Sequence, residues 1–332
     1  MIRHITNGDV ARDMLMAGGL DGAAILPWRD VLHDGPIPQG LDDAALDARR
    51  VAYLGDLAPR ARVAADMAWR AAFLAAWRPG DPLVLWFEHD LYDQLQILQV
   101  LDRLARQAGG DLSGVAMICI GHHPAVDRFR GLGDLSPAQA VDLLDIRQPV
   151  TTAQRDLAQA LWADLRRPDP RPLAARRGGD LSALPFMADA ITRFLADYPW
   201  TTDGLTLTER LLLQAVEETA DTFGRLFTDY MDREAAPFLG DLMADRILAD
   251  LEAGPAPLVA RAVAEPDRPL GPGTSFRVTD RGRAVLTGAA MWDRPADRPP
   301  LWRGGVNVTE GGWRWDPAAE AIRPPLPSPA GP

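Results

Sequence analysis

Side chains suited to acid–base chemistry gather in the first part of the chain. All five histidines lie at or before position 123. Glu88 and His89 directly follow an apolar run, and a charged pair at the end of a buried segment is a candidate for acid–base catalysis, with His89 as the acid or base and Glu88 orienting it. Asp90 and Gln94 are expected to contact the same substrate. The alternative for Asp90 is a purely structural role as the N-cap of the next helix.

A second polar group lies between positions 28 and 38, in a segment stiffened by prolines. Arg29 could hold a carboxylate or phosphate in a bidentate way, and Trp28 could stack on a ligand. Asp30 and His33 would position the substrate or a metal ion and share in catalysis. In the structural alternative, Arg29 pairs with a neighbouring aspartate and Trp28 is packing.

A third polar group, Asn7, Gly8 and Asp9, follows the first apolar run. A glycine turn that opens a helix exposes backbone N–H groups to an anion, so these residues are expected to bind substrate. The alternative is a tight turn in which Asp9 caps the helix. The pattern is neither a GxGxxG fingerprint nor a Walker loop, so no particular nucleotide is indicated.

No metal or cofactor can be specified from motifs. Asp9, Asp30, His33, Glu88 and His89 could form a mixed nitrogen and oxygen site, but no HExxH-like spacing is present, so we assign no metal ligands and leave the cofactor unknown. A GxSxG elbow is also absent from the sequence, which disfavours an α/β-hydrolase triad.

Short apolar runs alternate with helical segments in this part of the chain. The expected strands are 2–6, 23–27, 82–87 and 115–120, and the expected helices are 11–17, 43–77 and 91–107. This alternation predicts a Rossmann-like α/β layered domain with a largely parallel sheet. Because the carboxyl ends of parallel strands share one edge, the three polar groups should converge there, together with His122 and His123, of which at most one should face the site.

The rest of the chain is predicted to be mostly helical. We divide the whole chain into a Rossmann-like domain (1–135), a helical connection with a Pro- and Arg-rich linker (136–180), a second domain (181–320) and a disordered tail (321–332). The second domain should contain helices at 184–198, 206–219 and 238–252, a strand, turn and helix at 276–286, and a hairpin pairing 302–308 with 313–316.

Composition limits the partners and the compartment. A formal charge of −11 and a pI of about 4.9 make nucleic acid an unlikely partner. The single cysteine, Cys119, fits a reducing compartment. The sequence shows no secretory signal and no apolar run near the ~20 residues of a membrane span, so we predict a cytoplasmic protein without membrane contact. A homo-oligomer remains open.

Two stretches resemble DUF1835, a bacterial family of unknown function. They are HITNGDVARDMLMAGGLDGAAILPWRDVLHDGPIPQGL and PLVLWFEHDLYDQLQILQVLDRL, with further agreement in FRGLGDLSPAQ, GLTLTERLLLQAV, PFLGDLMADRILADL and LWRGGVNVTEGGWRWD. The resemblance implies no particular reaction. Separately, two helices followed by TSFRVTDRGRAVLTG are similar to winged-helix modules.

Two functions follow from these patterns. The first is a hydrolase or transferase that acts on a small anionic, nucleotide-like molecule at the strand ends. The alternative is a binding or regulatory protein, in which a ligand on the first domain controls the winged-helix-like half.

Overall fold

The computed structural model describes residues 2–219, 222–263, 270–271 and 273–325. They form two compact units. The N-terminal unit comprises Met1–Thr192 with Gly304–Val306, and the C-terminal unit comprises Arg193–Arg303 with Asn307–Pro332. This places the change of unit after Thr192, inside helix α8 (Met187–Ala196), whereas the sequence analysis placed it after position 180.

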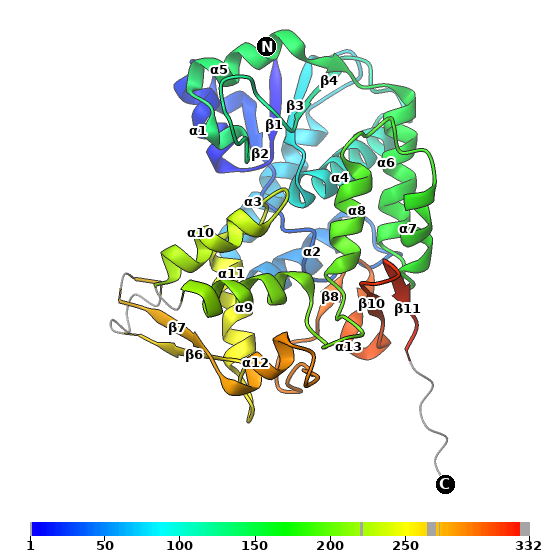
Figure 1. The fold of residues 1–332 in the computed structure, drawn as a ribbon. Coiled ribbons are helices and arrows are strands. Elements are labelled where there is room, and N and C mark those ends of the chain that lie inside the picture. The colour runs from blue at the N-terminus through cyan, green and yellow to red at the C-terminus, as the bar shows by residue number, and fades with distance from the viewer. Residues whose placement is uncertain (1, 220–221, 264–269, 272, 326–332) are drawn as a thin grey trace. The chain divides into compact units, whose positions relative to one another are not determined.

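The N-terminal unit is built on a five-stranded sheet with the strand order β2-β1-β3-β4-β5 (Figure 1). Its strands are β1 (Arg3–Thr6), β2 (Ile25–Pro27), β3 (Leu83–Glu88), β4 (Val115–Ile120) and β5 (Gln148–Pro149). The first four are parallel, and β5 runs antiparallel to β4. The predicted α/β fold with a largely parallel sheet is confirmed.

The central strand β3 explains how the sheet is buried. All six of its residues are buried, as expected of a strand covered on both faces. Val84 and Trp86 pack with helix α1 (Asp9–Ala17) and helix α5 (Pro137–Asp142) on one face. Helix α4 (Leu91–Gln107) contacts β3, and helix α6 (Thr152–Leu165) packs on α4.

Two predicted segments of the N-terminal unit differ in the structure. The single helix expected over 43–77 is two helices, α2 (Asp43–Leu54) and α3 (Arg60–Ala75), because Gly55 ends the first and Pro59 precedes the second. The Pro- and Arg-rich stretch proposed as a linker contains helix α7 (Arg171–Ala175) and a 3₁₀ turn, η4 (Arg176–Gly178). The remaining 3₁₀ turns are η1 (Gly22–Ala24), η2 (Leu132–Asp134) and η3 (Leu143–Ile146).

The C-terminal unit is mainly helical. It contains α9 (Leu207–Thr219), α10 (Phe223–Arg233), α11 (Asp241–Glu252), the antiparallel pair β6 (Val259–Ala262) and β7 (Ser275–Val278), and α12 (Asp280–Leu286). Thr222 forms a bridge with Ser275 at the edge of that pair.

The predicted terminal hairpin is wrong in its pairing. Strand β8 (Trp302–Arg303) pairs with β9 (Val306–Asn307), and β10 (Arg314–Asp316) pairs antiparallel with β11 (Ala321–Arg323), with helix α13 (Val308–Gly311) between the two pairs. The tail predicted to be disordered therefore begins with a strand, and positions 326–332 lie outside the described residues.

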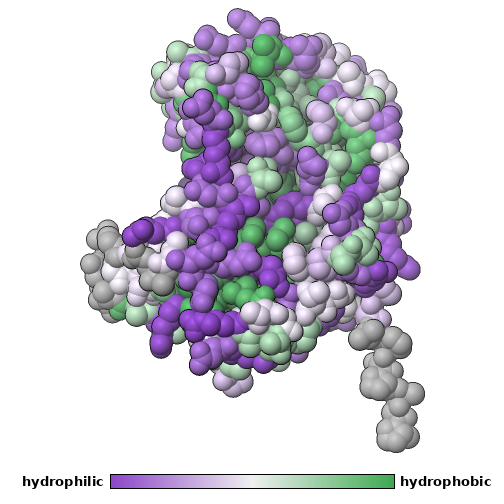
Figure 2. Space-filling model, viewed as in Figure 1, coloured by the Kyte–Doolittle hydropathy of each residue, from purple (hydrophilic) through white to green (hydrophobic). Residues whose placement is uncertain are grey.

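Hydrophilic side chains cover much of the face seen in Figure 2, with hydrophobic side chains between them. Among the helices of the described ranges, none has the length and apolar character required to cross a membrane.

Candidate active site

The carboxyl ends of β1 and β3 form the centre of the candidate site. The chain passes from β1 outward to β2 and then returns to β3 on the other side of β1, so the direction of strand succession reverses between β1 and β3. In open α/β sheets, ligands bind in the crevice at such a switch point. Asn7 follows β1, and its Nδ2 donates to Glu88 Oε1 at the end of β3, at 3.0 Å.

Three carboxyl groups meet next to Asn7. Glu88, Asp90 and Asp93 each offer an oxygen that lies within 4.8 Å of the other two, and all three residues are buried. Asp90 is the N-cap of α4, and its side chain accepts from Asp93 N at 3.0 Å. The expected alternative role of Asp90 as an N-cap is therefore correct. Asp93 Oδ2 accepts from Glu88 N at 2.6 Å and from Asn7 Nδ2 at 3.0 Å. We call these three residues the carboxyl cluster.

The carboxyl cluster has no cationic partner in the described part of the chain. Among the described residues, no ion pair includes any of its three carboxyl groups, and Asp93 Oδ1 is buried without a hydrogen-bond partner. Burial raises the pKa of Glu88 from 4.5 to about 7, although hydrogen bonds from Leu132 N and Asn7 oppose the rise. Burial and the neighbouring carboxylates raise the pKa values of Asp90 and Asp93 as well.

Glu88 is held closely on its remaining side. Leu132 N donates to Glu88 Oε1 at 2.7 Å, and a Cβ atom placed on Gly131 would lie only 2.2 Å from Glu88 Oε2. The segment before η2 therefore has room for the carboxyl group only because residue 131 lacks a side chain.

His89 lies near the cluster in sequence but has different neighbours. Its ring packs against Phe129 and Phe186, with centroids 6.2 and 5.9 Å away, and its Nδ1 is buried without a hydrogen-bond partner. Burial lowers the pKa of His89, which favours the neutral imidazole. In the described structure Glu88 makes no hydrogen bond to His89, so the expectation that Glu88 orients this ring is corrected.

Gln94 supports the end of β3 rather than facing outward. It is buried, and its Nε2 donates to Glu88 O at 2.7 Å and contacts Cys119 Sγ at 3.4 Å. Burial raises the pKa of the Cys119 thiol to about 12, which keeps it protonated, although the residue as a whole is half-buried rather than in the core.

Arg29 and Asp9 form a pair of their own. Arg29 Nε and Nη2 donate to Asp9, with Nη2 2.6 Å from Oδ1, and Nη1 lies 2.5 Å from Asp66 Oδ1. The pKa of Asp9 is lowered, chiefly by the Arg29 hydrogen bonds. The guanidinium that was expected to hold an anion is thus engaged by two carboxylates of the chain itself. Gly8 is the N-cap of α1, makes no side-chain cap, and has open space beside its Cα.

Three residues predicted for the site lie in the interior instead. Trp28 is fully buried, with Arg70 over its ring at 4.3 Å and its Nε1 bonded to Gln99 Oε1, so the structure leaves no open face for stacking on a ligand. Asp30 is buried against Arg50, with the two charged groups 2.8 Å apart. His33 is buried with its ring at an angle to Tyr92, 6.1 Å between centroids.

The sequence analysis did not identify Asp93 as a site residue. It also did not identify Asn7 as the residue that donates a hydrogen bond to Asp93. The signal was present in EHDLYD, where three acidic residues fall within six positions at a strand-to-helix junction. An acidic residue three positions after an N-cap folds back over the helix start, as in a capping box, which would have directed Asp93 toward Glu88.

Comparisons with known proteins assign no family. No family model matches the chain, and no curated protein matches it. The resemblance to DUF1835 therefore stays a prediction. Among solved structures, the chain is similar to the Aeropyrum pernix ORC1 protein in complex with DNA, at 12% identity and a TM-score of 0.23, over 87% of this chain and 77% of that one.

This comparison contradicts one prediction. The matched structure is a complex with DNA, so the inference from net charge that nucleic acid is an unlikely partner is not retained. A TM-score of 0.23 does not itself assign a fold or a partner to this chain.

Proposed function

We propose that the N-terminal unit is a hydrolase or transferase for a small anionic, nucleotide-like substrate, and that the carboxyl cluster holds a divalent cation for this reaction. The observation that carries the proposal is the burial of Glu88, Asp90 and Asp93 at the switch point of the sheet with no basic partner among the described residues. Buried carboxylates are costly unless they are paired, protonated or bound to a metal.

The donor set favours a hard cation. Carboxylate oxygens suit Mg²⁺, Mn²⁺ and Ca²⁺, and a buried Asp93 Oδ1 that accepts nothing is an acceptor available to such an ion. A bound cation would also attract a phosphate or carboxylate substrate to an edge of the sheet whose own arginine, Arg29, is already engaged.

His89 is our candidate for the proton transfer. Its lowered pKa leaves the imidazole neutral near pH 7, so it can accept a proton from an attacking water or hydroxyl. It is less buried than the cluster, which suits a group that must reach the substrate. The cluster and His89 would then have separate roles, cation binding and proton transfer.

The experiment measures turnover of p-nitrophenyl phosphate, bis(p-nitrophenyl) phosphate and ATP with Mn²⁺ or with a chelator. We expect cation-dependent turnover of at least one probe, lowered roughly 10²-fold by Glu88→Gln or Asp93→Asn because a ligand is lost. His89→Asn should lower kcat by about 10²-fold or more while Mn²⁺ affinity stays the same.

The matched control is Asp13→Asn, an exposed aspartate on α1 that should leave turnover unchanged. Turnover that persists in the chelator, or in Asp93→Asn, would contradict the proposed role of the cation. Absence of turnover with every probe would remove the catalytic part of the proposal.

A second candidate is the ligand-responsive regulatory protein. Its support is the element order of the C-terminal unit, in which α9, α10 and α11 precede the β6–β7 pair and Thr222 forms an isolated bridge with Ser275 of β7. That order is the one expected of a winged-helix-like module. A substrate analogue that binds without being turned over, and that changes hydrogen exchange in α9–α11, would favour this candidate.

A further inference from the structure

The C-terminal unit contains a cavity that is separate from the carboxyl cluster. It has a volume of about 240 Å³. Its walls come from several segments of the unit, and the lining residues include Glu209, Trp292, Arg294, Leu301, Val308 and Trp313. We call it the Glu209 cavity.

The walls are suited to a flat ring. Two tryptophans, Trp292 and Trp313, line the cavity together with Leu301 and Val308. Aromatic and aliphatic walls favour planar apolar surfaces. An apolar cavity of about 150 Å³ is known to hold one benzene molecule, so 240 Å³ leaves room for a two-ring heterocycle.

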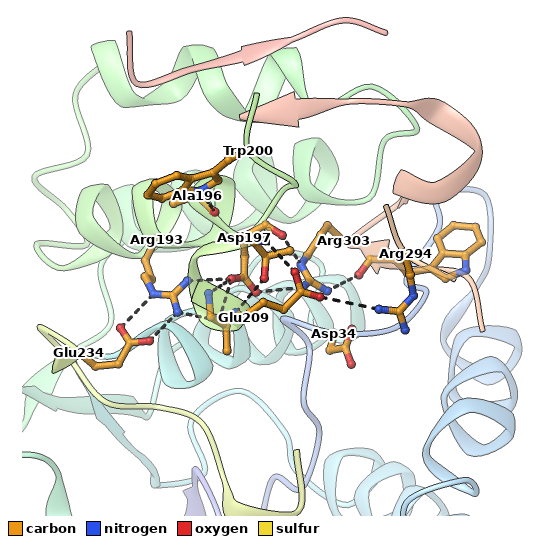
Figure 3. A network of polar contacts seen from close by, with 12 residues as sticks. Asp34, Arg193, Ala196, Asp197, Trp200, Glu209, Glu234, Arg294 and Arg303 are labelled. Carbon is orange, nitrogen blue, oxygen red and sulfur yellow. Dashed lines mark hydrogen bonds and ion pairs between the residues drawn. The ribbon is translucent and has the colours of Figure 1, made fainter. Parts of the chain in front are cut away.

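One wall of the cavity offers an acceptor and a donor side by side (Figure 3). Glu209 is 4% exposed, and its Oε2 accepts from Thr206 N at 2.7 Å at the start of α9. Its Oε1 accepts no hydrogen bond from the described residues and lies 3.9 Å from Arg294 Nη1. Arg294 uses Nε for Pro299 O and Nη2 for Asp250, which leaves Nη1 free of hydrogen bonds within the described part of the chain.

The environment of Glu209 differs from that of the neighbouring buried carboxyl group, Asp197. Asp197, close to Glu209 in Figure 3, is bonded by Arg193, Arg303 and the Thr208 backbone. Those partners lower its pKa, whereas burial raises the pKa of Glu209 to about 7. Glu209 is thus a buried cavity-lining carboxyl group whose second oxygen has only the longer 3.9 Å ion pair with Arg294 and accepts no hydrogen bond from the described residues.

The charges that line the cavity balance. Glu209 and Asp293 offset Arg294 and Arg314, so the lining favours neither a cationic nor an anionic ring. A neutral ring with an N–H group next to a carbonyl would donate to Glu209 Oε1 and accept from Arg294 Nη1. Such a lactam edge occurs in guanine, hypoxanthine and related bases.

We propose that the Glu209 cavity binds a neutral planar heterocycle through its lactam edge, with the ring N–H on Glu209, the carbonyl on Arg294 and the ring faces against the tryptophans. This site is independent of the function proposed for the N-terminal unit.

The probes are guanosine and 1-methylguanosine, which differ only at ring N1, where a methyl group replaces the N–H that should reach Glu209. Isothermal titration calorimetry of the full chain should detect guanosine binding, and 1-methylguanosine should bind at least about tenfold more weakly. Glu209→Gln can keep the acceptor for Thr206 N but turns an N–H₂ group toward the ring. This variant should therefore bind guanosine at least about tenfold more weakly than the wild type.

Glu217→Gln is the matched control, because it makes the same change on the exposed side of α9, and it should bind guanosine like the wild type. Thermal unfolding and circular dichroism are the measurements that check whether Glu209→Gln folds. Trp313→Leu, which keeps Glu209 and removes one ring wall, should also weaken guanosine. Equal affinities for the two nucleosides, an unchanged affinity in Glu209→Gln, or no binding at millimolar guanosine would each overturn the proposal.

Discussion

Replacing Arg50 with alanine is expected to lower the free energy of unfolding of the N-terminal unit by about 3–5 kcal/mol. The Arg50 and Asp30 side chains are both fully buried, with Nη2 and Oδ1 2.8 Å apart. Arg50 also donates to Asp34 O and Val31 O, and so fixes the turn that follows β2. Its removal leaves Asp30 with Arg70 at 3.6 Å as the remaining cation and leaves two carbonyl groups without this donor.

Urea unfolding of the full chain, with hydrogen exchange of peptides from β2 and α2 to locate the change, measures this effect. Arg29→Ala is the matched control, because its ion pairs are partly exposed, and it should cost about 1 kcal/mol or less. The double variant Arg50→Met with Asp30→Asn should recover only part of the loss, since it removes the Asp30 carboxylate but leaves the buried Arg70 without this ion-pair partner. A loss in Arg50→Ala no larger than in Arg29→Ala would show that the buried pair does not stabilise this loop.

The stability of the N-terminal unit is expected to fall as the pH rises from about 4.5 to above 7 in the absence of divalent cations. Glu88 has a raised pKa in the folded chain, so the folded state holds a proton that the unfolded chain has already released. Its stabilising effect is complete below 4.5 and is lost as the pH passes through about 7. The expected loss from Glu88 is on the order of 3 kcal/mol, and Asp90 and Asp93 act in the same direction.

Hydrogen exchange of peptides from β3 and α4 is the appropriate measurement, because Glu209 in the other unit also has a raised pKa and would add its own pH dependence to a global signal. Asp9 and Asp197 have lowered pKa values, so their contributions change at more acidic pH, outside this window. Glu88→Gln should flatten the profile, and Mn²⁺ should protect these peptides increasingly as the pH rises, since a cation binds the ionised carboxylates. If hydrogen exchange of these peptides in the wild type does not change with pH, the raised pKa values of the carboxyl cluster are contradicted.

The sheet could be predicted because its strands are continuous apolar runs bounded by glycine and charged residues. In β3, the run from Leu83 to Phe87 identifies a strand buried on both faces, and polar residues that follow each strand locate its carboxyl end. Convergence of Asn7 with Glu88 then follows from strand adjacency, which the alternation of strands and helices implies. The break between α2 and α3 was missed because alanine-rich helical sequence continues on both sides of Gly55 to Pro59.

The side-chain partners could not be predicted. Arg29, Asp30 and Trp28 are neighbours in sequence, yet Arg29 pairs with Asp9, Asp30 with Arg50, and Trp28 contacts Arg70 and Gln99. Those partners come from helices up to 71 positions away, and their approach depends on how α2, α3 and α4 pack, which periodicity does not specify. The same limit applies to His89, whose ring contacts Phe129 and Phe186 from distant segments.

Binding of Mn²⁺, followed by electron paramagnetic resonance of the free ion, tests the carboxyl cluster most directly. We predict that the wild-type chain binds Mn²⁺ at this site, that Mg²⁺ competes for it, and that Glu88→Gln and Asp93→Asn weaken binding at least about tenfold, while Asp13→Asn does not. Binding should strengthen as the pH rises through about 7, because the cation displaces the proton of Glu88. No Mn²⁺ binding at millimolar concentration, or equal affinity in the wild type and Asp93→Asn, would contradict a cation site at the carboxyl cluster.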